Sequence, residues 1–114
     1  MRFESEVLTE DLLPAIRSIM ASRLDEEFGL NQYEIAELLN LTQPAVSQYL
    51  NNKRAGKKLK DNLKDDPQID LLLKEAADNA AAEEDFSEEI ENVVTAVRDK
   101  GILKQEFKQA ERIL

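Results

Sequence analysis

The sequence contains neither histidine nor cysteine. The chain therefore has no imidazole to act as a general base, no thiol nucleophile, no disulfide framework and none of the usual soft metal ligands. Carboxylates, hydroxyls and amines are the groups that remain for any chemistry. We accordingly predict that the protein is not an enzyme, and we expect no catalytic residue, no metal site and no cofactor.

Helix-interrupting residues are scarce, because the chain has only three glycines and three prolines. This scarcity favours long helices. Aromatic residues make up 5% of the sequence and hydrophobic residues 42%, which is enough for a core built mostly from Leu, Ile, Val and Ala. A length of 114 residues fits one domain, or one small domain with an appended helical segment. Because no alternating pattern is long enough for a β-strand, we predict an all-α fold.

Long apolar runs are also missing. No stretch approaches the roughly 20 consecutive apolar residues that a membrane-spanning helix needs. The N-terminal segment carries Glu4, Glu6 and Glu10 where a secretory leader would have basic residues and an apolar run. We therefore expect a soluble, cytoplasmic protein that does not contact a membrane.

The net charge of −9 is distributed unevenly along the chain. Residues 1–60 hold eight Lys or Arg and nine Asp or Glu, whereas residues 61–114 hold seven and fifteen. Residues 38–60 contain no acidic residue and five basic ones. These basic residues are Lys53, Arg54, Lys57, Lys58 and Lys60. The overall negative charge repels a polyanionic partner. A basic island of this kind nevertheless attracts such a partner locally.

Apolar residues recur at spacings of three and four over residues 11–28, which predicts an amphipathic helix. The apolar stripe consists of Leu13, Ile16, Met20 and Leu24. Asp11 is placed to cap this helix, and Pro14 falls in its first turn, where a missing N–H costs little. Gly29 stands where a left-handed terminating residue is expected.

A second helix is predicted to begin after Asn31, with Glu34 three residues later completing a capping box. It ends before Asn40, a residue type that tolerates positive φ. Thr42 then offers a new N-cap, and Pro44 falls in the first turn of the helix that follows. The pattern thus predicts two short helices joined by a three-residue turn.

Residues 31–54 read NQYEIAELLNLTQPAVSQYLNNKR. This segment resembles the helix-turn-helix of phage-repressor-like transcriptional regulators of the Cro and XRE type. The resemblance is carried by the small Ala36 where the two helices cross, by Thr42 at the second cap and by five core positions. The core positions are Ile35, Leu39, Leu41, Val46 and Leu50. Asn40 stands where the family usually has glycine.

The resemblance implies an N-terminal helix-turn-helix bundle that binds double-stranded DNA, with residues 43–51 as the recognition helix in the major groove. The residues expected to face base edges are Gln43, Ala45, Ser47 and Gln48. Gln can pair with adenine, Ser can donate or accept, and Ala can pack on a thymine methyl group. Gln32 is expected to touch a phosphate, and Thr42 caps the recognition helix. The electrostatic footprint for the phosphates is expected to be Asn51, Lys53, Arg54, Lys57 and Lys58.

Three segments are predicted along the chain. They are a helix-turn-helix DNA-binding domain at residues 1–56, a basic-to-acidic connector at residues 57–66 and a helical tail at residues 67–114. The composition of the connector suits either a solvated linker or a marginal helix. The tail opens with the favoured cap-then-proline order at Asp66 and Pro67. Ser87 is expected to cap a further helix that ends at Gly101, and a final amphipathic stretch follows.

The tail carries more apolar surface than three short helices are expected to hide within one subunit. The apolar residues concerned are Val93, Val97, Leu103, Phe107, Ala110 and Leu114. We therefore predict a homodimer that forms through residues 67–114. Such a dimer would present two recognition helices to half-sites about 34 Å apart.

The segment at residues 12–17 and the overall length also resemble small archaeal predicted transcriptional regulators, which pair a domain of this kind with a short helical tail. Relatives in that group often carry cysteines in the tail, and iron-sulfur or redox sensing has been suggested for those cysteines. This chain has no cysteine, so the resemblance implies no such sensing here.

Two functions from different classes remain open. The first is a sequence-specific DNA-binding regulator, acting as a repressor, and the alternative is a helical protein-interaction module that keeps the scaffold without specific DNA binding. The acidic run at residues 83–89 lacks the spaced oxygen ligands and the turn glycine of a calcium loop, so we expect a solvated face there.

Overall fold

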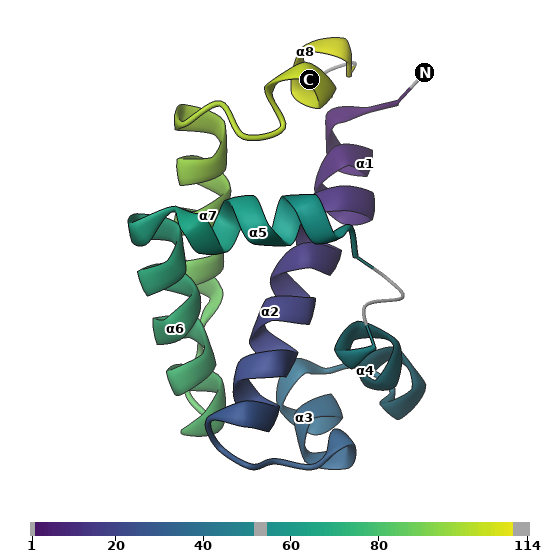
Figure 1. Cartoon of the computed structure of the whole chain (residues 1–114), viewed down its shortest axis with the longest axis vertical. Helices are drawn as coiled ribbons and strands as arrows, with labels where there is room; N and C mark the ends of the chain where they lie inside the picture. Colours follow the sequence, from purple (N-terminus) through teal and green to yellow (C-terminus); the bar gives the residue numbers. More distant parts are fainter. Residues whose placement is uncertain (1, 52–54, 111–114) are drawn as a thin grey trace.

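The computed structural model describes residues 2–51 and 55–110, and within them all regular secondary structure is helical (Figure 1). The predicted all-α fold is confirmed. The elements in chain order are α1 (Glu4–Val7), the π-helical segment η1 (Leu8–Leu12), α2 (Leu13–Glu26), α3 (Gln32–Leu39), α4 (Gln43–Leu50), α5 (Lys57–Asp65), α6 (Pro67–Ala81), α7 (Ser87–Asp99) and α8 (Lys104–Gln109).

Helix α2 runs through the middle of the molecule and packs against α3, α4, α5 and α6. Figure 1 shows α6 and α7 side by side, α5 crossing the bundle, and the α3–α4 pair at one end. Helices α1 and α8 lie together at the opposite end. The central helix therefore links the two ends of the molecule.

The first helical stretch begins earlier than predicted, at Glu4 instead of Asp11, because α1, η1 and α2 run on without a break. A π-turn precedes Pro14, in which the Leu13 N–H donates to the Leu8 carbonyl. The wider turn suits a proline inside a helix, since its ring crowds the carbonyl four residues before it and it has no N–H to donate. Asp11 does not cap the helix, and its carboxylate instead accepts from the Arg2 guanidinium at 3.0 Å.

Gly29 ends α2 as predicted, with a φ of +65°. The Leu30 N–H reaches back to the Leu24 carbonyl at 3.2 Å, which closes the left-handed C-terminal motif. The chain then turns directly into α3.

One hydrophobic core connects the predicted N-terminal domain and the predicted tail. Ile16 and Leu24 of α2 belong to the same buried cluster as Leu73 of α6 and Val97 of α7. The two segments therefore share one hydrophobic core in the structure.

For the connector at residues 57–66 the structure shows a helix, which was one of the two predicted possibilities, and this helix is part of the core. The helix is α5, and Leu63 on its inner face is completely buried. Leu59 lies four residues earlier on the same face and is partly buried against the core. This single apolar stripe on a helix rich in Lys and Asp is enough to seat α5 on α2 and α6.

Asp66 caps α6 as predicted, because its carboxylate accepts from the Ile69 N–H at 3.0 Å. Ser87 does not cap α7 with its side chain. The Asp85 carboxylate instead accepts from the Ser87 N–H at 3.2 Å and from the Ser87 hydroxyl at 2.7 Å. Gly101 follows α7 with a φ of +75°.

The apolar residues assigned to a dimer interface are largely used within the chain. Val93 and Val97 are fully buried by α6, and Leu103, Phe107 and Ala110 are half-buried. The guanidinium carbon of Arg98 lies over the Phe107 ring of α8, 4.5 Å from the centroid of the ring. The expectation that one subunit cannot hide Val93 and Val97 is therefore wrong, and Leu114 lies outside the described residues.

No helix within residues 2–51 and 55–110 combines the length and the apolar character that crossing a membrane requires.

Candidate functional site

Helix α3 is held at its start by a reciprocal pair of hydrogen bonds. The Asn31 side chain accepts from the Glu34 N–H at 2.9 Å, and the Glu34 carboxylate accepts from the Asn31 N–H at 3.1 Å. This capping box is confirmed. It satisfies two N–H groups that a helix start leaves without a partner.

The turn between α3 and α4 has the predicted conformation. Asn40 is left-handed, with a φ of +54°, and the Leu41 N–H donates to the Ala36 carbonyl at 2.8 Å. The Thr42 hydroxyl then accepts from the Ala45 N–H at 3.2 Å and caps α4, with Pro44 in the first turn. A three-residue turn of residues 40–42 thus fixes the direction of α4 relative to α3.

Helix α4 is anchored to α2 by apolar packing and by one buried hydrogen bond. Val46 and Tyr49 are buried on its inner face. The hydroxyl of Ser18, 1% exposed, donates to the Tyr49 carbonyl at 3.0 Å in the last turn of α4. Ser18 was not among the predicted site residues, although a serine inside the apolar stripe of α2 was a signal that a buried polar partner exists.

Gln32 and Gln43 are brought together across the turn. The Gln43 side-chain amide donates to the Gln32 side-chain carbonyl at 2.5 Å, and both residues are half-buried. The bond joins the first residue of α3 to the first residue of α4. It restricts the Gln43 side chain at the N-terminal end of α4, which lowers the entropy cost of presenting it to a partner.

The outer face of α4 is polar. Gln48 is exposed, and Ser47 is half-buried. Asn51, at the end of the helix, is exposed and donates its side-chain amide to the Ser47 hydroxyl at 3.4 Å. Together with Gln43, these residues offer amide and hydroxyl groups along one side of the helix.

Ala45 does not belong to this outer face. It is 7% exposed and forms part of the hydrophobic core. Its position four residues before Tyr49 places it on the inner side of α4. The expectation that Ala45 packs on a thymine methyl group is therefore wrong.

Two of the predicted basic residues, Lys57 and Lys58, are exposed in the first turn of α5. Lys57 forms a salt bridge of 3.4 Å with Asp61. Cations at a helix N-terminus oppose the helix dipole, each at a cost of about 0.3–1 kcal/mol. Lys53 and Arg54, which were also predicted to contact phosphates, lie outside the described residues.

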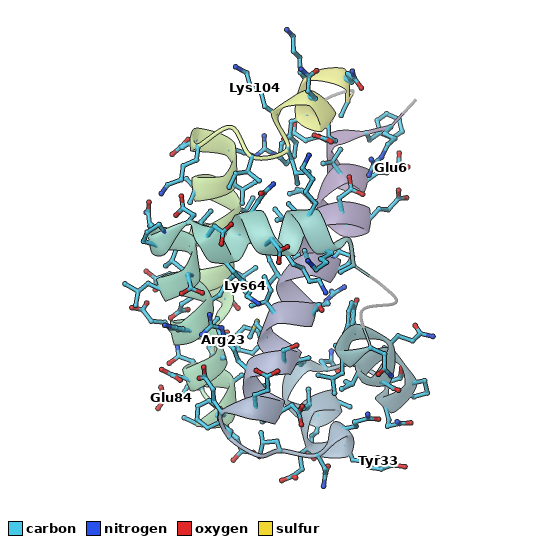
Figure 2. The ribbon with its side chains drawn as sticks, in the orientation of Figure 1. Glu6, Arg23, Tyr33, Lys64, Glu84 and Lys104 are labelled. Atoms are coloured by element: carbon cyan, nitrogen blue, oxygen red, sulfur yellow. The ribbon has the colours of Figure 1, made fainter. Side chains whose placement is uncertain are left out.

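Tyr33 was not predicted as a site residue, yet it is the most exposed large hydrophobic side chain of the described residues, at 73%. Figure 2 shows it pointing away from the molecule beside α3, at the end that also carries α4. An aromatic residue in the first turn of a short helix, outside its apolar face, was the available signal.

In the part of the chain that the structure describes, no three Asp or Glu side chains are grouped so that they could hold a metal ion. No protein-family model, curated protein or solved structure matches the chain significantly. The geometry of the α3–α4 pair and its surroundings is therefore what bears on function.

Proposed function

We propose that this protein is a sequence-specific double-stranded DNA-binding transcriptional regulator that acts as a repressor by occupying its operator. The observation that carries the proposal is the Gln32–Gln43 hydrogen bond, which orients Gln43 at the start of α4. In helix-turn-helix proteins the N-terminal residues of the second helix contact base edges. A pre-oriented Gln side chain at that position suits readout of the major groove.

The outer face of α4 has the chemistry for this readout. Gln43 and Gln48 can each pair with adenine through two hydrogen bonds, and Ser47 can donate or accept. Each good bidentate pair contributes about 1–3 kcal/mol of discrimination against the wrong base. Gln32 would hold Gln43 in place in addition to any phosphate contact of its own.

The charge distribution also supports a duplex that lies against α4. Lys57 and Lys58 follow α4 in the chain and are exposed, with Lys53 and Arg54 between them and α4 in the sequence. The acidic turn between α6 and α7 lies on the other side of the molecule from α4, as the position of Glu84 in Figure 2 shows. A duplex at α4 would thus meet the basic residues while the acidic turn stays away from it.

We further propose that the active species is a homodimer formed through residues 67–114. Single small modules bind DNA weakly, whereas a dimer contacts two half-sites about 34 Å apart. Leu71 of α6, 56% exposed, is the exposed large hydrophobic side chain in the described part of this segment. Loss of the dimer in solution on Leu71→Asp would support this interface, and a monomeric native protein would contradict it.

The test of DNA binding is duplex affinity across a salt series, with a selected operator and a random duplex. Gln43→Ala is expected to cost about 1–3 kcal/mol on the operator and to relax specificity at one base pair. Lys58→Ala is expected to weaken all sequences alike and to reduce the salt slope by about 1. Gln105→Ala, on an exposed residue of α8, is the matched control and should change neither quantity.

A protein-interaction module is the alternative, and the 73% exposure of Tyr33 favours it, because exposed aromatic residues are enriched at protein interfaces. Absence of duplex binding at low salt, or equal effects of Gln43→Ala on operator and random duplex, would overturn the DNA-binding proposal in favour of this one.

A further inference from the structure

A polar cleft with a volume of about 750 Å³ lies between α2, α5 and α6, next to Leu50 in the last turn of α4. Helix α5 contributes Lys57, Lys60 and Lys64 to its wall, and α2 contributes Ser18, Ser22 and Arg23. Lys64 and Arg23 are labelled in Figure 2, in the region that these three helices frame. Of the residues that line this cleft, the DNA-binding proposal uses only Lys57.

The three lysines line the cleft because of their spacing. Positions 57, 60 and 64 are three and four residues apart, so they fall on one face of α5. Like charges at these spacings repel one another, and two of them also lie near the helix start, where the dipole disfavours cations. The arrangement costs folding free energy that an anion bound between the lysines would offset.

Lys60 is the most enclosed of the three. It is 8% exposed, and its ammonium donates to the Ser18 hydroxyl at 3.4 Å. Burial, and next the charge of Lys64, lower the pKa of Lys60 below its ordinary value. Both causes act against the ammonium form, and a bound anion would act in its favour.

The carboxylates that share the cleft are mostly engaged with other cations. Asp70 binds Arg23 and Lys74, and Asp61 binds Lys57. Glu27 forms a salt bridge of 3.6 Å with Arg23, while Glu26 and Asp65 are exposed to solvent. Lys64 forms no salt bridge with any described residue, so its ammonium is available to a ligand.

We propose that this cleft binds a small polyanion, such as a diphosphate or a tricarboxylate, between the ammonium groups of Lys60 and Lys64 on α5 and the hydroxyl of Ser22 on α2. The lysines supply charge and donors, and the Ser22 hydroxyl supplies a neutral donor from the facing helix. A ligand with two or more negative charges matches the two ammonium groups in charge.

Binding is tested by calorimetric titration with pyrophosphate and, separately, with citrate, at an ionic strength kept constant with sodium chloride. Saturable binding to one site is expected for at least one of the two, and the probe that binds identifies phosphate or carboxylate chemistry. Lys64→Gln should weaken that binding at least about tenfold. Lys58→Gln changes the same charge on the same helix, outside the cleft, and should leave the affinity within about twofold.

Absence of saturable binding by both probes would overturn the proposal. An equal loss in Lys58→Gln and Lys64→Gln would also overturn it, because diffuse surface charge would then account for the binding. Lys60→Met should remove binding as well, and if this variant does not fold, Lys64→Gln remains decisive. The titration contains no DNA, so its result is independent of the DNA-binding proposal.

The cleft is also connected to α4, and this consequence does rest on the proposed function. Ser18 accepts from Lys60 and donates to the Tyr49 carbonyl of α4. A bound anion would neutralise the lysines beside α4 and so lower duplex affinity. Unchanged duplex affinity at saturating anion would remove this coupling, while anion binding and DNA binding would each stand on their own tests.

Discussion

Asp66 joins two helices that are distant in the sequence. Its carboxylate caps α6 through the Ile69 N–H and also accepts from the Lys100 ammonium, beyond the end of α7, at 2.9 Å. The hydrogen bond from Lys100, followed by the one from Ile69, lowers the pKa of the Asp66 carboxyl below its ordinary value of 3.8. The capping role was readable from the Asp66-Pro67 order, but the Lys100 partner was not.

This lowered pKa makes a prediction for acid stability. A carboxyl whose pKa is lower in the folded state stabilises the fold above its unfolded pKa, and the stabilisation is lost as the pH falls through the folded value. The unfolded pKa of an Asp carboxyl is about 3.9, which lies between pH 5 and pH 2. Over this pH range we therefore expect the melting temperature of Asp66→Asn to fall less than that of the native chain. Asp78→Asn, on an exposed residue of α6, is the charge-matched control and should retain the native profile. Parallel profiles for native protein and Asp66→Asn would contradict the argument.

At the scale of elements, α5 is a larger part of the core than its composition predicted. A segment dominated by Lys and Asp has the composition of a solvated connector, and only Leu59 and Leu63 distinguish it. In the structure those residues meet α2 and α6, and the helix closes one side of the core. The same contact places the α5 lysines along the cleft.

A pair of substitutions in α5 tests whether this helix is integral to the core. Leu63→Ala removes a fully buried side chain, so we expect a loss of about 2–5 kcal/mol in the free energy of unfolding. Asn62→Ala, on an exposed residue of the same helix, is the control and should stay within about 0.5 kcal/mol. Urea unfolding measures both values. Similar small losses in the two variants would mean that α5 is peripheral in solution.

Elements of the candidate site were predictable to different degrees. The caps at Asn31 and Thr42 and the left-handed Asn40 follow from residues at most three positions apart, and all were confirmed. The Gln32–Gln43 bond and the burial of Ala45 depend on how α3 and α4 cross. Helix periodicity alone does not predict the angle at which two helices cross. The sequence therefore predicted neither the Gln32–Gln43 bond nor the burial of Ala45.

On the scale of the whole molecule, the core is continuous from α2 to α7. Ile16 and Leu24 share a cluster with Leu73 and Val97, which come from the predicted tail. Small domains are marginally stable because they bury a limited share of their surface. Removing a large part of one core therefore threatens the whole fold.

This continuity predicts the behaviour of a fragment. Residues 1–56 alone lose the partners that α5, α6 and α7 provide for α2, so we expect little helical circular dichroism and no cooperative melting. The full chain is expected to melt in a single transition, with calorimetric and van't Hoff enthalpies in agreement. Cooperative melting of the fragment would instead support an independent N-terminal domain.

The sequence by itself determined the caps at Asn31, Thr42 and Asp66, the glycine ends of α2 and α7, the α3–α4 pair and the all-α class, because these depend on neighbouring residues and on composition. The tertiary structure decided which apolar faces meet. It buried Ala45 in α4, used Val93 and Val97 within the chain and turned a charged segment into a core helix. The physical reason is that periodicity gives each helix an apolar side, while the partner of that side is chosen by long-range packing.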